Sequence, residues 1–250
     1  MVVIPSMTMP LIIYGLLTGS VYMLLATSLT LIFGTLKLIN LVQGDLMIVA
    51  AFTAFLLTTR ADLGTYISLV PAIAVTVVLS YVMYRYGLRY IDQSNINAQV
   101  MFTLGLSFMT ESAIAYYFLP VYHSSVIIPS PLRNMSVNIM GFPVTYDEII
   151  VIVVSWAMLA ALYTWLFRTE QGTAIRALGQ NPLGAAITGI NTDRLSVLAF
   201  IVGGVMTAVA GFLFGVMYTF GPYTGGSVTF NAIAILTLGG FGSLPGALVG

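Results

Sequence analysis

Residues 195–220 read LSVLAFIVGGVMTAVAGFLFGVMYTF, and neither they nor the residues that follow as far as Gly250 include a charged side chain. An α-helix needs about 20 apolar residues to cross the hydrocarbon core of a membrane. A strand of a membrane β-barrel would instead alternate apolar and polar residues, and runs such as residues 149–154 (IIVIVV) do not alternate. The stretch therefore predicts membrane-spanning helices.

The rest of the chain has the same character. Hydrophobic residues make up 59% of the 250 residues and charged residues 6%, against about 25% charged residues in an average soluble domain. Long apolar runs predict seven membrane spans, at residues 11–33, 41–59, 66–84, 98–119, 149–167, 195–218 and 229–250. We expect an all-α fold, a polytopic transmembrane helical bundle of about seven to eight spans that forms one domain over residues 1–250.

Basic residues predict the orientation of the bundle, because Lys and Arg accumulate in short cytoplasmic loops. If the N-terminus lies outside, only Arg60 and Arg133 are external. The cytoplasmic basic residues are then Lys37, Arg85, Arg89, Arg168, Arg176 and Arg194. We therefore expect a multi-pass protein of the cell membrane with its N-terminus outside, residues 120–147 external and residues 168–194 cytoplasmic. The N-terminus has no basic region of the kind that begins a signal peptide, so the first span is expected to be retained.

Composition disfavours several functions. The eight basic and eight acidic residues balance, so nucleic acid is not an expected partner. Cysteine is absent and His123 is the only histidine, which excludes thiol chemistry and a histidine-rich metal site. Lys37 is the only lysine and lies in no phosphate-binding loop, so we expect no cofactor and no ATP hydrolysis on this chain.

Two polar features interrupt the predicted spans. Thr103, Ser107 and Glu111 follow one another at intervals of four residues, which places them on one stripe of a helix. The stripe predicts either a polar face that lines a pathway or a hydrogen bond from Glu111 that ties two helices together. Residues 37–45 (KLINLVQGD) include Asn40 and Asp45 and predict either a cytoplasmic turn or a helix break at depth beside a substrate.

The loop at residues 168–194 is the largest polar segment on the predicted cytoplasmic side. Asn181 followed by Pro182 is typical of the start of a helix, and Gly189 is typical of its end. We expect a short helix over residues 182–188 whose exposed face carries the small residues Gly184 and Ala185, which would suit a partner's groove.

Small residues also recur every four positions within the apolar runs. One stripe comprises Gly203, Thr207, Gly211 and Gly215, and a second comprises Gly242, Gly246 and Gly250. Small residues on one helix face let backbones approach closely, so these stripes predict helix packing.

Six motifs follow one another along the chain: residues 15–22 (GLLTGSVY), 29–34 (LTLIFG), 39–45 (INLVQGD), 188–194 (TGINTDR), 198–204 (LAFIVGG) and 238–246 (LGGFGSLPG). Taken in this order, they resemble the membrane permeases of ATP-binding cassette importers for branched-chain amino acids. The resemblance covers nearly the whole chain.

The resemblance implies a permease subunit that forms the translocation path for branched-chain or similar neutral amino acids. Two cytoplasmic ATPase subunits that bind ATP and Mg²⁺, a second permease subunit (a paralogue or a second copy) and an extracytoplasmic binding protein would be its partners. It also implies a cytoplasmic coupling loop at residues 168–194, with ATPase-coupling positions at Asn181, Pro182, Ala185, Ala186, Gly189, Asn191, Asp193 and Arg194. Candidate positions on the translocation path are Asn40, Gln43, Asp45, Thr103, Ser107 and Glu111.

The chain departs from the family pattern at two of these positions. Gln43 stands where the family usually has histidine, and Glu111 stands where an uncharged amide is common. The family continues for at least another helix beyond the position of Gly250, so we also expect this chain to be truncated at its C-terminus. Three alternatives stay open: a permease for urea or short amides, a self-sufficient secondary transporter, and a purely structural membrane subunit.

Overall fold

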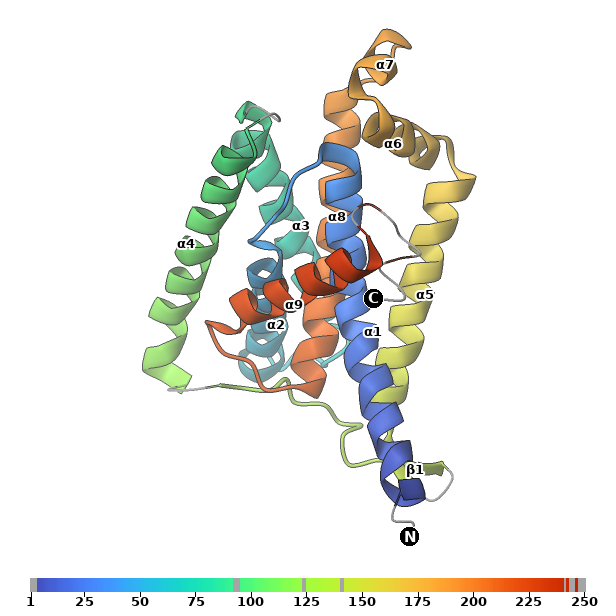
Figure 1. Cartoon of the computed structure of the whole chain (residues 1–250). Coiled ribbons are helices and arrows are strands. Elements are labelled where there is room, and N and C mark those ends of the chain that lie inside the picture. The colour runs from blue at the N-terminus through green and yellow to red at the C-terminus, as the bar shows by residue number, and fades with distance from the viewer. Residues whose placement is uncertain are drawn as a thin grey trace.

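The computed structural model describes residues 4–91, 95–122, 125–139, 142–240, 242 and 246. Within these ranges the chain forms helices and one β-hairpin (Figure 1). In chain order the elements are α1 (Ile4–Leu36), α2 (Gln43–Arg60), α3 (Leu69–Tyr86), the 3₁₀ turn η1 (Leu88–Tyr90), α4 (Ile96–Tyr122), β1 (Ser136–Ile139), β2 (Phe142–Thr145), α5 (Tyr146–Arg168), α6 (Glu170–Gln180), α7 (Pro182–Ile187), α8 (Thr192–Met217) and α9 (Thr224–Gly239).

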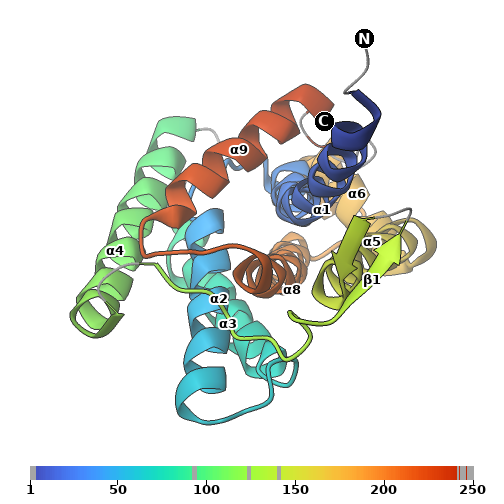
Figure 2. The ribbon, with the colours of Figure 1, turned by 90° about the horizontal axis from the view of Figure 1, so that it is seen from below.

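The α8 helix lies at the centre of the bundle. It packs against α1, α2 and α3, and Figure 2 shows it end-on with these helices around it. The most apolar stretches of α1 and α8 are each 72% buried, whereas those of α3 and α5 are 28% buried. The outer helices therefore present apolar side chains outward, which is the arrangement that a bundle in lipid requires.

Glycines on α8 allow this close packing. A Cβ atom at Gly211 would collide with the carbonyl oxygen of Met47 on α2, and one at Gly203 would lie 3.1 Å from Ile32 Cδ1 on α1. A Cβ atom at Gly204 would lie 2.8 Å from Ser80 Oγ on α3. The predicted packing role of the first small-residue stripe is thereby confirmed, because Gly203 and Gly211 lie at two helix crossings.

The first six predicted spans each coincide with a helix, and the boundaries differ by a few residues outside the N-terminal extension of α1. Among the described residues, four helices are long and apolar enough to cross a membrane: Leu11–Leu36, Leu69–Tyr90, Tyr146–Arg168 and Thr192–Met217. The α2 and α4 helices, which carry the polar candidates, do not reach this apolarity. The observed architecture is thus a polytopic membrane helical bundle.

The seventh predicted span, at residues 229–250, is not observed as such. The helix in this region is α9, which ends at Gly239 and is followed by Gly240 with φ 87°. Its 16 residues rise about 24 Å, less than the roughly 30 Å of a bilayer core. Figures 1 and 2 show α9 lying obliquely across α2 and α1, the helices that it packs against.

Of the second predicted stripe, Gly242 to Gly250, the structure describes Gly242 and Gly246. Gly242 has φ 80°, in the left-handed region, so it cannot share an α-helical face with Gly246. Gly250 and His123 lie outside the described residues.

A β-hairpin that the all-α prediction missed joins α4 to α5. Strands β1 and β2 pair antiparallel, with Val137 opposite Val144. The segment before the hairpin is tied to the bundle by Asp147, whose Oδ1 accepts hydrogen bonds from Tyr66 Oη and Ser130 Oγ, both at 2.7 Å. Four-residue strands are too short for a sequence dominated by long apolar runs to reveal.

Candidate translocation path and coupling loop

The chain breaks between α1 and α2 at the depth of the bundle. Lys37, with φ 56°, ends α1 and is exposed, and the following residues run without helical structure back into the bundle, where α2 begins (Figure 1). Asn40, Gln43 and Asp45 are each at most 1% exposed. The interpretation of residues 37–45 as a cytoplasmic turn therefore fits Lys37 alone, and the remainder is a buried helix break.

A buried hydrogen-bond network surrounds this break; we call its four members, Ser28, Asn40, Gln43 and Thr207, the amide cluster. Asn40 Nδ2 donates to Gln43 Oε1 at 2.7 Å, and Gln43 Nε2 donates to Ser28 Oγ at 2.6 Å and to Thr207 Oγ1. Ser28 Oγ also donates to the carbonyl of Gly203 at 2.9 Å. The cluster joins α1, the helix break, α2 and α8.

Asp45 connects the break to α4 and α9. Ser107 Oγ on α4 donates to Asp45 Oδ2, while Asp45 Oδ1 has no hydrogen-bond partner. One residue earlier, the Gly44 amide donates to Thr229 Oγ1 on α9 at 2.9 Å. A side chain at Gly44 would collide with α9, so glycine is required where the two backbones meet.

The predicted stripe on α4 divides into an inner and an outer part. Thr103 is fully buried and donates to the carbonyl of Gln99 at 3.0 Å on its own helix, whereas Ser107 reaches Asp45. Glu111 is half-buried, one turn beyond Ser107, and lies beside Gly226 of α9. The structure therefore brings Ser107 and Asp45 together, with Glu111 at the edge of the same region.

We expect Gln43→Leu to destabilise the bundle by about 2 to 4 kcal/mol. The substitution leaves the buried Asn40 Nδ2 without an acceptor, which costs about 1 to 3 kcal/mol, and removes the hydrogen bond from Gln43 to Ser28, which is worth about 1 kcal/mol. Thermal unfolding of the purified protein in detergent measures the change. Gln171→Leu is the matched control, because Gln171 lies on the exposed side of α6. Gln99 is buried and is therefore unsuitable as a control. An equal Tm for the two variants would contradict the assigned role of the cluster.

The loop at residues 168–194 forms two helices, one more than predicted. Asn181 caps α7 by accepting a hydrogen bond from the Gly184 amide at 2.9 Å, with Pro182 as the first helical residue. Asn191 caps α8 in the same way from the Arg194 amide at 3.0 Å, and Gly189, with φ 84°, makes the turn between them. Figure 1 shows α7 as the part of the molecule that extends furthest beyond α1 and α8.

The exposed face of α7 differs from the prediction. Ala185 is 5% exposed, so it faces the rest of the loop and not outward. Gly184 is half-buried, and Ala186 is exposed. The outward positions are occupied by Leu183 and Ile187, which are 73% and 78% exposed and lie four residues apart.

Sequence reasoning missed two contacts that hold the loop to the bundle. Arg89 Nε forms a salt bridge with Asp193 Oδ1 at 3.1 Å, which joins η1 to the start of α8. A Cβ atom at Gly179 of α6 would collide with the carbonyl oxygen of Gly34, in the last turn of α1. Neither contact has a local signal, since each joins residues far apart in the sequence.

The chain matches proteins of known family along most of its length. The model of the family described as branched-chain amino acid transport system / permease component matches residues 11–250. No solved structure matches the chain.

Curated relatives show the same likeness. The high-affinity branched-chain amino acid transport system permease protein LivH of Escherichia coli K12 is 29% identical over 94% of this chain and 80% of the relative. The corresponding protein BraD of Pseudomonas aeruginosa is 27% identical over 96% and 81%, and a probable LivH of Methanocaldococcus jannaschii is 26% identical over 94% and 75%. These matches confirm the family that the ordered motifs predicted. The chain therefore belongs to the family of branched-chain amino acid transport system permease components.

Proposed function

We propose that this chain forms half of the translocation path of an ATP-driven importer for branched-chain or similar neutral amino acids. A permease component is the non-catalytic transmembrane subunit of such a system. ATP hydrolysis then takes place on two cytoplasmic ATPase subunits, a second permease (a copy or a paralogue) completes the path, and an external binding protein delivers the solute. The lipid bilayer surrounds the pair.

The observation that carries the proposal is a continuous connection between the exposed loop and the buried helix break. The α8 helix begins at the cap that ends the loop, and fifteen residues later it contributes Thr207 to the amide cluster. On the other side, α6 rests through Gly179 on the Gly34 carbonyl, three residues before the break begins at Lys37. Movement of α7 by a partner would therefore reach the break through two packed elements.

The arrangement of charges supports the proposed orientation. Six basic residues lie at or near helix ends on the side of α6 and α7 (Figure 1): Lys37, Arg85, Arg89, Arg168, Arg176 and Arg194. At the opposite end, Arg60 Nε donates to Tyr122 Oη at 3.3 Å, and Arg133 donates to the Val216 carbonyl. The loop end faces the cytoplasm in this proposal, because basic residues are retained there. The N-terminus then lies outside the cell membrane.

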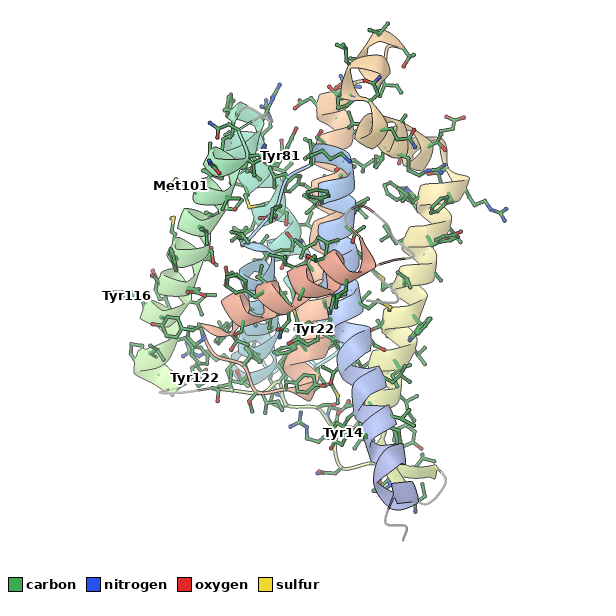
Figure 3. The ribbon with its side chains drawn as sticks, viewed as in Figure 1. Tyr14, Tyr22, Tyr81, Met101, Tyr116 and Tyr122 are labelled. Atoms are coloured by element: carbon green, nitrogen blue, oxygen red, sulfur yellow. The ribbon has the colours of Figure 1, made fainter. Side chains whose placement is uncertain are left out.

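The seven predicted spans take two forms in this proposal. Helices α1, α3, α4, α5 and α8 cross the bilayer, whereas α2 begins at the break and α9 lies across the bundle (Figure 1). The outer face of α4 meets lipid or the second permease: Figure 3 shows Met101 and Tyr116 pointing away from the bundle, and each is 75% exposed. Irregular backbone is tolerated at depth only where protein or a water-filled cavity surrounds it, as at the helix break.

Purification from membranes followed by reconstitution in vesicles tests the proposal. We expect the intact complex to contain an ATPase subunit and to take up leucine only when ATP and the binding protein are both supplied. Uptake of urea or acetamide in place of leucine would assign the alternative substrate class. Uptake by this chain alone that stops when the proton or sodium gradient is collapsed would replace the proposal with a secondary transporter.

A further inference from the structure

Two carboxylates meet the first turn of α9 from neighbouring helices. A Cβ atom at Gly225 would collide with Asp45 Oδ1, and a Cβ atom at the next residue, Gly226, would lie 3.4 Å from Glu111 Oε1. Two successive glycines thus leave room for Asp45 on one side and Glu111 on the other. Glu111 is the sixteenth of the 27 residues of α4, so the pair lies near the middle of that helix.

Neither carboxylate is neutralised by a basic side chain within the part of the chain that the structure describes. The ion pair found there joins Arg89 to Asp193, at the cytoplasmic end of the bundle. Asp45 is 1% exposed and receives one hydrogen bond, from Ser107, and its other oxygen faces Gly225 without a donor. Glu111 makes no hydrogen bond among the described residues and is accessible at the surface of the bundle.

The carboxyl groups have acceptor oxygens to spare. Asp45 Oδ1 is buried without a donor, and the Ser107 hydroxyl donates only to Oδ2. A buried polar group without a partner is costly, so the region has unused capacity for a donor group.

We infer that Glu111 binds the ammonium group of the transported solute, with Asp45 behind it as a positioning residue that holds α4 through Ser107. The inference rests on the proposed function and narrows it: the solute carries a positive group, as a free amino acid does and as urea and short amides do not. An ammonium group offers three hydrogen-bond donors, and the half-buried Glu111 carboxylate can accept from it while Asp45 remains buried. The position of Gly226 beside Glu111 depends on how α9 packs. Asn231, on the same helix, donates a hydrogen bond to Tyr22 Oη of α1 at 3.2 Å and so links α9 to α1 (Figure 3).

The first experiment measures ATP-dependent leucine uptake by the complete complex in vesicles, with Glu111→Gln in the permease. We expect the uptake rate to fall roughly tenfold to hundredfold, because a charge-assisted hydrogen bond is lost while side-chain shape is kept. Glu111→Asp, which keeps the charge, should retain more uptake than Glu111→Gln. Asp62→Asn, an exposed carboxylate in the loop between α2 and α3, is the matched control and should transport like the parent protein.

ATP hydrolysis separates this inference from the proposed function. Leucine-loaded binding protein should stimulate hydrolysis in the Glu111→Gln complex to within about twofold of the parent, since the coupling loop is untouched. Parent complex that takes up no leucine would overturn the proposed function itself. Parent complex that takes up leucine, with Glu111→Gln transporting equally well, would overturn the ammonium site alone.

A second experiment removes the binding protein, whose own selectivity would obscure that of the path. Calorimetric titration of the purified permease–ATPase complex compares leucine with 2-hydroxy-4-methylpentanoate, in which a hydroxyl replaces the ammonium group. We expect leucine to bind more tightly than the hydroxy acid to the parent complex, and this preference to be lost in Glu111→Gln. Binding of leucine no tighter than that of the hydroxy acid, or binding of neither, contradicts the inference.

Discussion

Simultaneous replacement of Leu183 and Ile187 by serine is expected to reduce ATP-dependent uptake to background and to release the ATPase subunits from the permease. These two side chains are 73% and 78% exposed on the outer face of α7, at the tip of the loop at residues 168–194. Full burial of an aliphatic side chain against a partner stabilises by about 1.5 to 3 kcal/mol, so the pair accounts for roughly 3 to 6 kcal/mol. A loss of that size weakens association by two orders of magnitude or more.

The fold should survive the double substitution, because both side chains are mostly exposed. Copurification of the ATPases with the tagged permease measures association, and leucine uptake in vesicles measures function. Met135→Ser is the control, since Met135 is 53% exposed at the opposite end of the molecule. Full uptake by the double variant would show that α7 does not transmit the motion of the ATPases.

The second large effect is expected from Gly211→Leu, at the crossing of α8 and α2. Any side chain there meets the carbonyl oxygen of Met47 and lies 3.1 Å from Ala50 Cβ, and a backbone atom cannot rotate away as a side chain can. Overpacking a helix crossing costs about 1 to 3 kcal/mol, and more where backbones must separate. Gln43 and Asp45 lie in the first turn of α2. Separation of the helices would therefore also disrupt the amide cluster and the hydrogen bond between Ser107 and Asp45.

Thermal unfolding in detergent measures this effect. A protein of this size loses about 2 to 4 °C of Tm for each kcal/mol, so a cost of about 1 to 3 kcal/mol should lower the Tm of the variant by about 2 to 12 °C. Gly19→Leu on α1 is the matched control, because no atom lies within 4 Å of a Cβ built at Gly19. Similar Tm values for the two leucine variants would contradict the role assigned to the α8 crossing.

Local features were predictable where neighbouring residues decide the structure. The cap at Asn181 and the turn at Gly189 need only the residue itself and the next few amides, so the short helix was placed almost to the residue. The exposed face of that helix was predicted wrongly at Ala185. Its phase depends on packing of α7 against the rest of the loop, which the pattern of small residues does not contain.

In the candidate path, the sequence indicated single polar residues, whereas helix packing decided which of them are in contact. Asp45 and Ser107 were each singled out as polar residues in apolar surroundings, because a polar group in a membrane must have a partner. That they are partners of one another depends on how α4 packs beside α2. Thr229 and Gly225 carried no signal at all, since a threonine and a glycine in an apolar run are ordinary until α9 is seen to cross Gly44.

The amino-acid sequence by itself determined that this protein is a membrane bundle, which end of it carries the basic residues, and which permease family it belongs to. Apolar length, charge position and ordered motifs are properties of the chain alone, and the bilayer imposes the helical form. Tertiary structure decided that α9 lies across the bundle, that the chain breaks at depth before Gln43, and that Asp45 and Glu111 flank one turn of α9. These features arise from close contacts between distant glycines and polar side chains, whose energies exist only once the helices have packed.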